Sequence, residues 1–561
     1  MFESLSLTGR QWRLRELPAG HGAALASALG VSQLSGEVFA GRQLDTGFFQ
    51  SSASALLDPA GMKGVELALT RLQDARLRRE KIRLVTDYDV DGTTSCLVLH
   101  AALDRLGGAD ISYHIPDRFT EGYGLSRRAV ETAAADGVRL IVTADIGVRD
   151  HATVSFAKSL GVEVIVCDHH LPLGEAVPAD ALAVLCPPQA GCGYANKALA
   201  ACGVSLKLAT ALLADDPRRE DILGSMLKLS AIGTVADIVD LATPENRAIV
   251  SLGLARLNGD RHGAGLAALL EVSGVRPGEI DAGTLGWRIG PRINAAGRLA
   301  DANAVVRLLR ERDPASARAQ AALLDELNRE RQDVQARLFD IVCAAVPTTP
   351  PPFLVLAGPE SEGYHRGVVG IVAAKVRERF NRPTAIVSVS GLVATGSIRS
   401  VPAIHATHAL DAAGHLLHRY GGHAAAAGFS IDTASLPQLE ASLHRYVAEH
   451  GGDDALVVEE WVDAVVSPGQ VTPQLVAELS RLEPCGKGNE KPRVVVNSRA
   501  TEVRVLKEKH LSFRLGSIRA LWWNAAERAG LLNQATAFLG QPSLNTYKGN
   551  TTAELVVDDI A

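Results

Sequence analysis

Short apolar runs alternate with helical stretches between residues 82 and 186, and this alternation constrains the fold more than any other feature of the chain. Strands are predicted at Ile82–Thr86, Ile111–Ile115, Val138–Thr143, Val162–Cys167 and Ala181–Cys186. Helices are predicted between them at Thr94–Leu106, Arg127–Ala135 and His151–Leu160. This alternation is typical of parallel βαβ units. The carboxyl ends of parallel strands meet at one edge of the sheet, where such folds place their sites.

Three carboxylates follow the first predicted strand. Asp87, Asp89 and Asp91 lie close together, and Gly92 permits a tight turn into the next helix. Unpaired carboxylates at this spacing repel one another and are costly to desolvate, whereas a hard divalent cation satisfies them. The alternatives are an acidic surface turn and a calcium loop, but Val98 stands where an EF-hand loop carries Glu.

Two further strands end in the same chemistry. Asp145 follows the third strand, and Asp168, His169 and His170 follow the fourth. Asp237 lies among apolar neighbours, where a helix-capping role is the alternative to metal binding. Mixed Asp and His ligands favour Mn²⁺ or Mg²⁺, and two such cations can clamp a phosphate and activate water. The residues therefore predict a metal-dependent phosphoesterase, and the lack of a GxxxxGK[ST] loop argues against an NTP-driven motor.

The rest of the chain predicts several domains. We expect a helical N-terminal segment at 1–75, a parallel-sheet catalytic domain at 76–300 and a connecting helix at 301–346, with Pro314 near a helix start. The proline-rich stretch 347–352 looks like a linker to a smaller α/β domain at 347–455. Alternating apolar strands with Gly and Asn turns predict a small β-barrel at 456–561.

Composition narrows the class of protein. The net charge of −6 argues against a simple basic nucleic-acid binder, although bound cations would offset an acidic site. The seven cysteines are odd in number and form no CxxC pair, which argues against a disulfide framework and a structural zinc site. We see no signal peptide and no apolar stretch of membrane-spanning length, so a cytoplasmic location without membrane association is expected.

The acidic and histidine motifs resemble those of the DHH phosphoesterase superfamily. They are Asp-Tyr-Asp-Val-Asp-Gly at 87–92, Ala-Asp-Ile-Gly at 144–147, Asp-His-His at 168–170 and Val-Ala-Asp-Ile at 235–238. Segments at 118–125, 290–298, 363–370, 421–423 and 483–489 are similar to those of the RecJ family of single-strand-specific exonucleases. This resemblance implies an α/β fold with a DHH catalytic domain, a connecting helix, a DHHA1 domain and a C-terminal OB fold.

The resemblance also implies roles for individual residues. Metal binding by two ions would fall to Asp87, Asp89, Asp145, His169 and Asp237, with Asp145 or Asp89 bridging. Many superfamily members carry a His where this chain has Arg83, so Asp91 is a candidate replacement ligand. His170 would face the phosphate as a leaving-group acid or a charge stabiliser.

The same resemblance assigns DNA or phosphate contact to a further set of residues. They are Arg118, Tyr123, Arg292, Asn294, Arg298, His365, Arg366, Gly367, Ser397, Arg399, Gly422 and His423. Gly367–Gly370 opens a predicted helix, whose free amides favour phosphate, although a glycine pair for close packing is the alternative. Each arginine could equally be an ordinary surface charge.

Two other features leave alternatives open. The basic run Arg76, Arg78, Arg79, Lys81 and Arg83 is either a solvated helix face or a nucleic-acid contact. Trp522 and Trp523 are adjacent, so in a strand they point to opposite faces. One of them should be buried, and the other could stack on a base.

Three functions are compatible with these features of the sequence. The first is an exonuclease that degrades single-stranded DNA from the 5′ end to 5′-mononucleotides, in recombination and repair; the resemblance suggests single-strand-binding protein and a helicase as partners. The second is a phosphodiesterase of cyclic dinucleotides or short oligonucleotides, which has little need of the C-terminal barrel. The third is a non-catalytic scaffold, which need not keep so many carboxylates unpaired.

Overall fold

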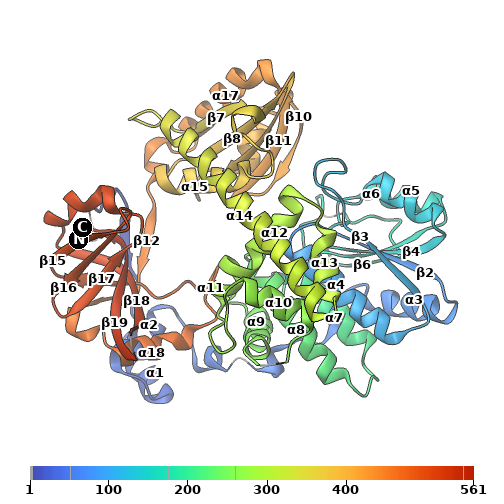
Figure 1. The fold of residues 1–561 in the computed structure, drawn as a ribbon, viewed down its shortest axis with the longest axis horizontal. Helices are drawn as coiled ribbons and strands as arrows, with labels where there is room; N and C mark the ends of the chain where they lie inside the picture. Colours follow the sequence, from blue (N-terminus) through green and yellow to red (C-terminus); the bar gives the residue numbers. More distant parts are fainter. Residues whose placement is uncertain (1–3, 51, 175, 260, 548) are drawn as a thin grey trace. The chain divides into compact units, whose positions relative to one another are not determined.

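The computed structural model describes residues 4–50, 52–174, 176–259, 261–547 and 549–561 (Figure 1). The chain divides into two compact units. The parallel-sheet unit consists of Gly47–Asn328 and Leu482–Lys491, and the mixed-sheet unit consists of Met1–Thr46, Arg329–Arg481 and Pro492–Ala561. Among the described stretches, none of the helices combines the length and apolar content that crossing a membrane requires. All seven cysteines carry free thiols.

A five-stranded, all-parallel sheet forms the centre of the parallel-sheet unit, in the order β3-β2-β4-β5-β6. Its strands are β2 (Lys81–Thr86), β3 (Asp110–His114), β4 (Val138–Ala144), β5 (Glu163–Cys167) and β6 (Ala183–Leu185). All five predicted strands are confirmed, with small shifts at their ends. The chain places β3 on one side of β2 and β4 on the other, so the direction of winding changes between β2 and β4. Open parallel sheets bind ligands at such a switch point.

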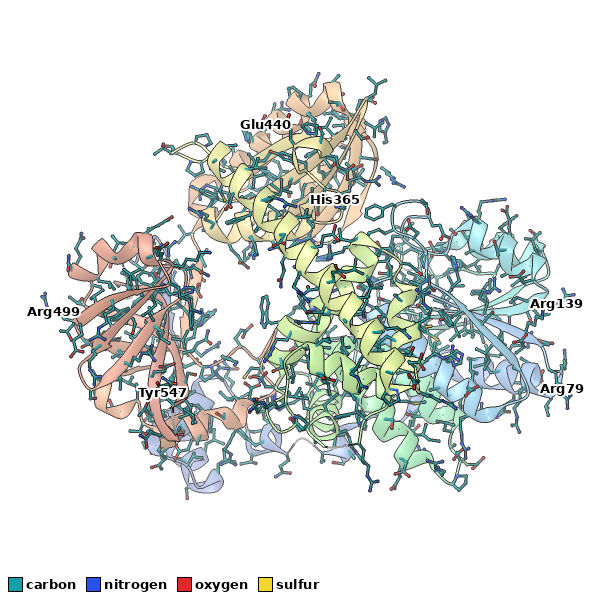
Figure 2. The ribbon with its side chains drawn as sticks, viewed as in Figure 1. Arg79, Arg139, His365, Glu440, Arg499 and Tyr547 are labelled. Atoms are coloured by element: carbon teal, nitrogen blue, oxygen red, sulfur yellow. The ribbon has the colours of Figure 1, made fainter. Side chains whose placement is uncertain are left out.

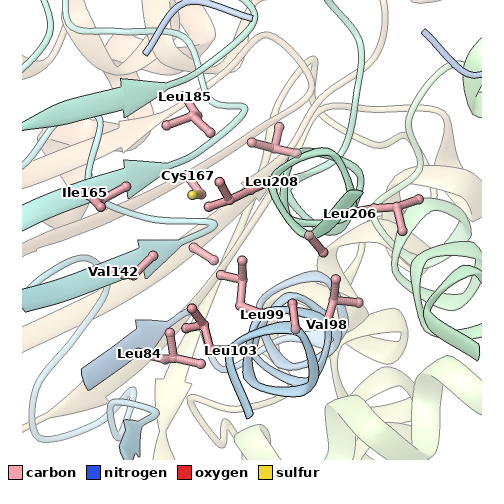
Figure 3. Close-up of a cluster of buried hydrophobic side chains, with 14 of the residues drawn as sticks. Leu84, Val98, Leu99, Leu103, Val142, Ile165, Cys167, Leu185, Leu206 and Leu208 are labelled. Atoms are coloured by element: carbon pink, nitrogen blue, oxygen red, sulfur yellow. The ribbon is translucent and has the colours of Figure 1, made fainter. Parts of the chain in front are cut away.

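Helices cover both faces of this sheet because its strands are apolar on both sides. One face packs against α4 (Val90–Leu106) and α7 (Ala201–Leu212), and Figure 3 shows strand residues such as Val142 facing Leu99 and Leu208 of these helices. The other face packs against α5 (Arg127–Ala135) and α6 (His151–Ser159). Helix α4 begins earlier than predicted because the Asp89 side chain accepts a hydrogen bond from the Gly92 amide and caps it.

Helix α3 (Val65–Leu77) joins α4 and α7 in the core on their face of the sheet. The remaining helices of this unit form a second core beside the sheet. They are α8 (Arg219–Ala236), α9 (Pro244–Leu257), α10 (Ala264–Val272), α11 (Ala282–Thr284), α12 (Gly290–Leu299) and α13 (Asn303–Arg310). The segment predicted as one connecting helix is in fact α13 followed by a separate long helix, α14 (Pro314–Ala345). The break arises because the Asp313 carboxylate accepts the Ser316 amide at 2.7 Å and starts α14 at Pro314.

The mixed-sheet unit contains a five-stranded sheet in the order β10-β11-β9-β8-β7. Its strands are β7 (Leu354–Pro359), β8 (Thr384–Ser390), β9 (Val393–Arg399), β10 (Leu417–Gly422) and β11 (Ala426–Asp432). It packs against α15 (Val369–Phe380), α16 (Ala406–Asp411) and α17 (Leu436–Glu449).

A seven-stranded sheet in the same unit has the order β13-β14-β18-β19-β17-β16-β15. The bounds are β13 (Ala464–Val466), β14 (Val494–Asn497), β15 (Ala500–Leu506), β16 (His510–Leu515), β17 (Ile518–Trp522), β18 (Ala537–Tyr547) and β19 (Asn550–Ile560). Helix α18 (Pro473–Leu479) lies between β13 and β14 along the chain.

The N-terminal region differs from the predicted helical segment. It contains α1 (His21–Leu29) and α2 (Gln33–Gly41), but it opens with the strand β1 (Gln11–Leu14), which pairs with β12 (Glu459–Val462). The indole of Trp12 is buried and donates a hydrogen bond to Asp559 Oδ2 at 2.7 Å. This strand depends on partners more than 400 residues away, which no local pattern reveals.

Candidate metal centre

The acidic residues meet at the switch point of the parallel sheet. The amide of Asp87 donates to Ala144 O at 3.2 Å, and the amide of Asp145 donates to Cys167 O at 3.0 Å, so the strand ladder continues into both residues. Asp145 has φ of 65°, a left-handed conformation that is strained for a residue other than glycine. Strain of this kind clusters at functional sites.

His169 lies among three carboxylates. Its Nε2 is 3.2 Å from Asp145 Oδ1, 3.7 Å from Asp237 Oδ2 and 3.9 Å from Asp91 Oδ2. A single ring nitrogen cannot donate to three acceptors. His169 can therefore satisfy only one of these three carboxylates.

The potential ligand atoms fall into three overlapping groups, each with its atoms within 4.8 Å of one another. The groups are Asp87, Asp89 and Asp145; Asp145, His169 and His170; and Asp91, His169 and Asp237. Asp145 and His169 each belong to two groups, and a shared carboxylate such as Asp145 is what adjacent cations with a bridging ligand require.

The burial of these groups fits a cation. Among the described residues, Asp87 Oδ1, Asp145 Oδ1 and His169 Nε2 are buried with no hydrogen-bond partner. Burial, followed by the charge of Asp89, raises the pKa of Asp87 well above its usual value. Burial, then the charges of Asp89 and Asp91, does the same to the pKa of Asp145. Carboxylate and imidazole donors that are buried without hydrogen-bond partners suit Mn²⁺ or Mg²⁺.

Backbone amides hold the Asp91 carboxylate in place. Its carboxylate accepts the amides of Ala201 and Cys202, at 2.8 Å each, at the start of α7. Arg83, which stands at the position of the superfamily histidine, forms an ion pair with Asp136 at 2.8 Å instead. Asp91 therefore anchors α7 and still presents Oδ2 toward His169.

Asp168 was not among the predicted site residues, yet it organises the histidine pair. It accepts from the amides of His169 and Val148 at 2.7 Å and 3.0 Å, and from Nδ1 of His170 at 2.8 Å. Burial acts to raise the pKa of Asp168, but the hydrogen bond from His170 and its charge outweigh burial and lower this pKa to about 2. Its position directly before two histidines at a strand end was the available signal.

A cavity of about 360 Å³ opens beside these ligands. Its lining consists of Asp87, Tyr88, Asp89, Arg118, Tyr123, His170, Ala236, Asn294, Gly297 and Arg298. Four predicted DNA-contacting residues, Arg118, Tyr123, Asn294 and Arg298, thus converge on the candidate metal centre. Tyr88 was missed by sequence reasoning; its ring lies 4.2 Å from the guanidinium of Arg118.

Arg292 is placed differently from the other predicted DNA contacts in this unit. It does not line the cavity, and its guanidinium contacts Asp325 at 2.8 Å and the carbonyl of Arg288 at 2.7 Å. In this structure Arg292 therefore ties α12 to α14.

The remaining predicted contacts lie in the mixed-sheet unit. Ser397 and Arg399 of β9 stand opposite Gly428 and Ala426 of β11. On the other side of β11, Gly422 stands opposite Ala427. The Arg399 guanidinium donates to Ser397 Oγ at 2.9 Å. A Cβ atom on Gly370, near the start of α15, would lie 3.1 Å from both side chains, so the helix approaches β9 closely here.

His365, labelled in Figure 2, precedes α15. Its Nδ1 accepts the Gly367 amide at 3.0 Å, so this amide, predicted to bind phosphate, points back to His365. The helix begins at Val369 rather than at Gly367. Arg366 is exposed, and the His423 amide donates to Ala426 O at 2.8 Å.

The basic run and the tryptophan pair are the two features for which the sequence left alternatives open. In the basic run, Arg78 contacts Asp74 at 3.7 Å and Lys81 donates to the carbonyl of Asp136 at 2.9 Å, as expected of a solvated face. Trp522 is 4% exposed and Trp523 is 52% exposed, so Trp522 is the core residue of the pair.

Comparisons with known proteins agree with this organisation. Three family models match: the DHH family, N-terminal domain, at residues 81–234; the DHHA1 domain at 351–449; and the RecJ OB domain at 462–559. The single-stranded-DNA-specific exonuclease RecJ of Bacillus subtilis is 32% identical over 98% of this chain and 71% of its own length. The chain belongs to the RecJ family. The predicted fold class is thereby confirmed.

Solved structures of RecJ are also similar to the structure of this chain. RecJ from Thermus thermophilus in complex with Mn²⁺ matches with a TM-score of 0.84 and 32% identity, over 98% of this chain and 79% of that one. The same protein in complex with Mg²⁺ matches with a TM-score of 0.78 and 31% identity, over 98% and 78%. Both metals are the ones that the donor set of this RecJ family member suits.

Proposed function

We propose that this chain is an exonuclease that hydrolyses single-stranded DNA from its 5′ end and releases 5′-mononucleotides, using Mn²⁺ or Mg²⁺. The observation that carries the proposal is the convergence of three carboxylate and imidazole groups with a cavity lined by Arg118, Asn294 and Arg298. The Bacillus subtilis relative is a single-stranded-DNA-specific exonuclease, which supports single-stranded DNA as the substrate.

Two cations would be held by Asp87, Asp89, Asp91, Asp145, His169 and Asp237. Bound there, they supply charge stabilisation to a phosphodiester undergoing hydrolysis. Asp145 is the best candidate for a shared position, because it belongs to two of the three groups and its carboxylate has two oxygens, whereas the single lone pair of His169 Nε2 would serve one cation.

The chain's own side chains then orient the phosphate. His170 is held through Nδ1 by Asp168, which leaves Nε2 for the cavity that the ring lines. In the imidazolium form, with a proton on both nitrogens, Nε2 can donate to a phosphate oxygen or pass its proton to the leaving group. Arg118 and Arg298 supply guanidinium charge to the strand. The Tyr123 hydroxyl donates to the carbonyl of Asp145 at 3.1 Å and lies 3.3 Å from Nε2 of His170, so it steadies the ring.

We propose recombination and repair as the setting. A helicase that exposes single strands and a protein that coats them would then be the partners, since the substrate must be unwound. We also propose a cytoplasmic location, where seven free thiols stay reduced.

The test is cleavage of end-labelled single strands, blunt duplexes and cyclic dinucleotides by the purified chain with Mn²⁺ or Mg²⁺. We expect mononucleotides to be released from the 5′ end of single strands, while blunt duplex resists, and EDTA to abolish the reaction. Equal rates on duplex and single strands would contradict the proposal, as would full activity in excess chelator. Hydrolysis of cyclic dinucleotides alone would favour the small-substrate phosphodiesterase.

A further inference from the structure

The segment Leu482–Lys491 belongs to the parallel-sheet unit, although the residues on either side of it, Arg481 and Pro492, belong to the mixed-sheet unit. It contains the Glu-Pro-Cys-Gly-Lys-Gly-Asn motif at 483–489, to which the proposed function assigns no role. Its position in the chain is more than 240 residues beyond Asp237.

Buried side chains hold this segment in place. The guanidinium of Arg247 is largely buried and donates to the carbonyl oxygens of Leu482, Glu483 and Pro484 at 2.9, 2.7 and 3.3 Å. The side-chain amide of Asn489 donates to the carbonyls of Leu482 and Pro484 at 2.7 and 3.0 Å. Burial lowers the pKa of Arg247 to about 10, which still leaves it charged at neutral pH. The segment is therefore fixed at both ends.

The tip, Gly486 to Gly488, rests on the residues just after Asp237. The Leu241 amide donates to Lys487 O at 2.8 Å. Gly488 has φ of 77°, and a Cβ atom there would lie 2.0 Å from Asp240 Oδ1. Only glycine fits such a conformation at such a distance. The glycines thus set Lys487 beside the turn that carries Asp237.

The Lys487 side chain is exposed, and its backbone is bonded to Leu241, four residues beyond Asp237. Among the described residues, no carboxylate forms an ion pair with Lys487. By contrast Lys491, in the same segment, lies 3.9 Å from Asp281 and 3.8 Å from Glu483.

On the function proposed above, we infer that Lys487 binds the substrate: its ammonium contacts a non-bridging phosphate oxygen of the strand held at the metal centre. A cation fixed by its backbone beside an acidic site, without a carboxylate partner, is suited to an anionic ligand that arrives with the metals. Lysine binds phosphate as a point charge, so Arg should substitute for it in part.

The test compares Lys487→Gln and Lys487→Arg with Lys491→Gln as the matched control. Affinity for a 5′-phosphorylated oligothymidylate is measured by fluorescence anisotropy with Ca²⁺ in place of Mn²⁺, over a range of salt concentrations. Lys487→Gln should weaken binding about threefold to tenfold and make the slope of log affinity against log salt shallower by about 0.7, the value for one phosphate contact on a single strand. Lys487→Arg should keep most of the slope, and Lys491→Gln should keep all of it.

Calorimetric titration with Mn²⁺ separates this role from a structural one. Removing a cation near Asp237 should leave Mn²⁺ affinity unchanged or slightly higher. An unchanged salt slope in Lys487→Gln overturns the inference, and so does weakened Mn²⁺ binding together with a lower melting temperature. If the unmodified chain neither binds nor cleaves single strands, the proposed function itself fails. If it does both, and Lys487→Gln has the same affinity and salt slope, only the inference about Lys487 fails.

Discussion

Nδ1 of His170 donates a hydrogen bond to the Asp168 carboxylate at 2.8 Å, and this contact determines which ring nitrogen can face a substrate. The donor must carry the proton, so Nδ1 is protonated and Nε2 is the nitrogen that remains for a substrate in the cavity lined by His170. Asp168 is almost fully buried, so the ring has little freedom to turn away.

The first prediction concerns this pair. Asp168→Asn should lower the single-turnover cleavage rate about 10- to 100-fold, because an amide has no charge to stabilise the protonated His170 ring and its N–H₂ group can hold the opposite tautomer. Most of the loss should be in kcat rather than in KM. Asp180→Asn is the control, since Asp180 is an acidic residue paired with Lys158 in the same unit. A rate equal to that of the unmodified chain would remove Asp168 from the mechanism.

The second prediction separates the two histidines. His169→Ala should reduce Mn²⁺ occupancy, because Nε2 lies among three carboxylates, and added Mn²⁺ should restore part of the activity. His170→Ala should keep its metal and slow the chemical step about 10²- to 10⁴-fold, as expected for a lost general acid. Calorimetry and single-turnover cleavage measure the two effects. Loss of metal from His170→Ala alone would reverse the two roles.

Much of the metal centre could be predicted from sequence because it follows from one rule. Asp87, Asp145 and His169 each come at the end of an apolar strand, and parallel strands bring their carboxyl ends to one edge. Local patterns were enough to find the strands and to bring these residues together as candidate ligands, whereas the choice of His169 over His170 came from the resemblance to the DHH superfamily.

The features that sequence reasoning missed depend on contacts between distant parts of the chain. The strand β1 needs β12 as its partner, and the segment Leu482–Lys491 packs in a unit to which its neighbours do not belong. Arg292 carries a charge that suits DNA, but Asp325 on α14 pairs with it. Periodicity and motif spacing contain no information about such pairings.

The third prediction is a pH dependence of the metal-free protein. The pKa values of Asp87, Asp145 and Asp237 are raised above the usual 3.8, chiefly by burial. The folded state therefore binds protons more tightly than the unfolded chain, and stability must fall as pH rises through the raised values. In EDTA, the melting temperature should increase as pH is lowered from about 8 to about 6.

Two controls accompany that measurement. Saturating Mn²⁺ should flatten the pH dependence, because the cation replaces the protons as the partner of the carboxylates. Asp145→Asn should raise the melting temperature in EDTA at neutral pH and also flatten the curve. A metal-free protein that becomes more stable toward high pH would contradict the burial of unpaired carboxylates.

The last prediction concerns the adjacent tryptophans at the end of β17, Trp522 and Trp523. Removing everything after residue 455 would not isolate the role of the seven-stranded sheet, because β12 and the carbonyls held by Arg247 would also be lost. A point change is cleaner. Trp523 is 52% exposed, and its ring lies 4.8 Å from that of His510, edge to face, whereas Trp522 is 4% exposed. Trp523→Ala should weaken binding to single strands about tenfold, by loss of one stacked base, while Trp523→Phe retains most of the affinity.

Trp522→Ala provides the contrast, since losing a buried ring should destabilise the fold by about 3–5 kcal/mol. Stacking carries no counterion release, so Trp523→Ala should leave the salt slope of binding unchanged, unlike a lost phosphate contact. Anisotropy titrations at several salt concentrations, with melting curves of each variant, distinguish the two effects. If Trp523→Ala bound single strands as tightly as the unmodified chain, the exposed ring would have no part in holding DNA.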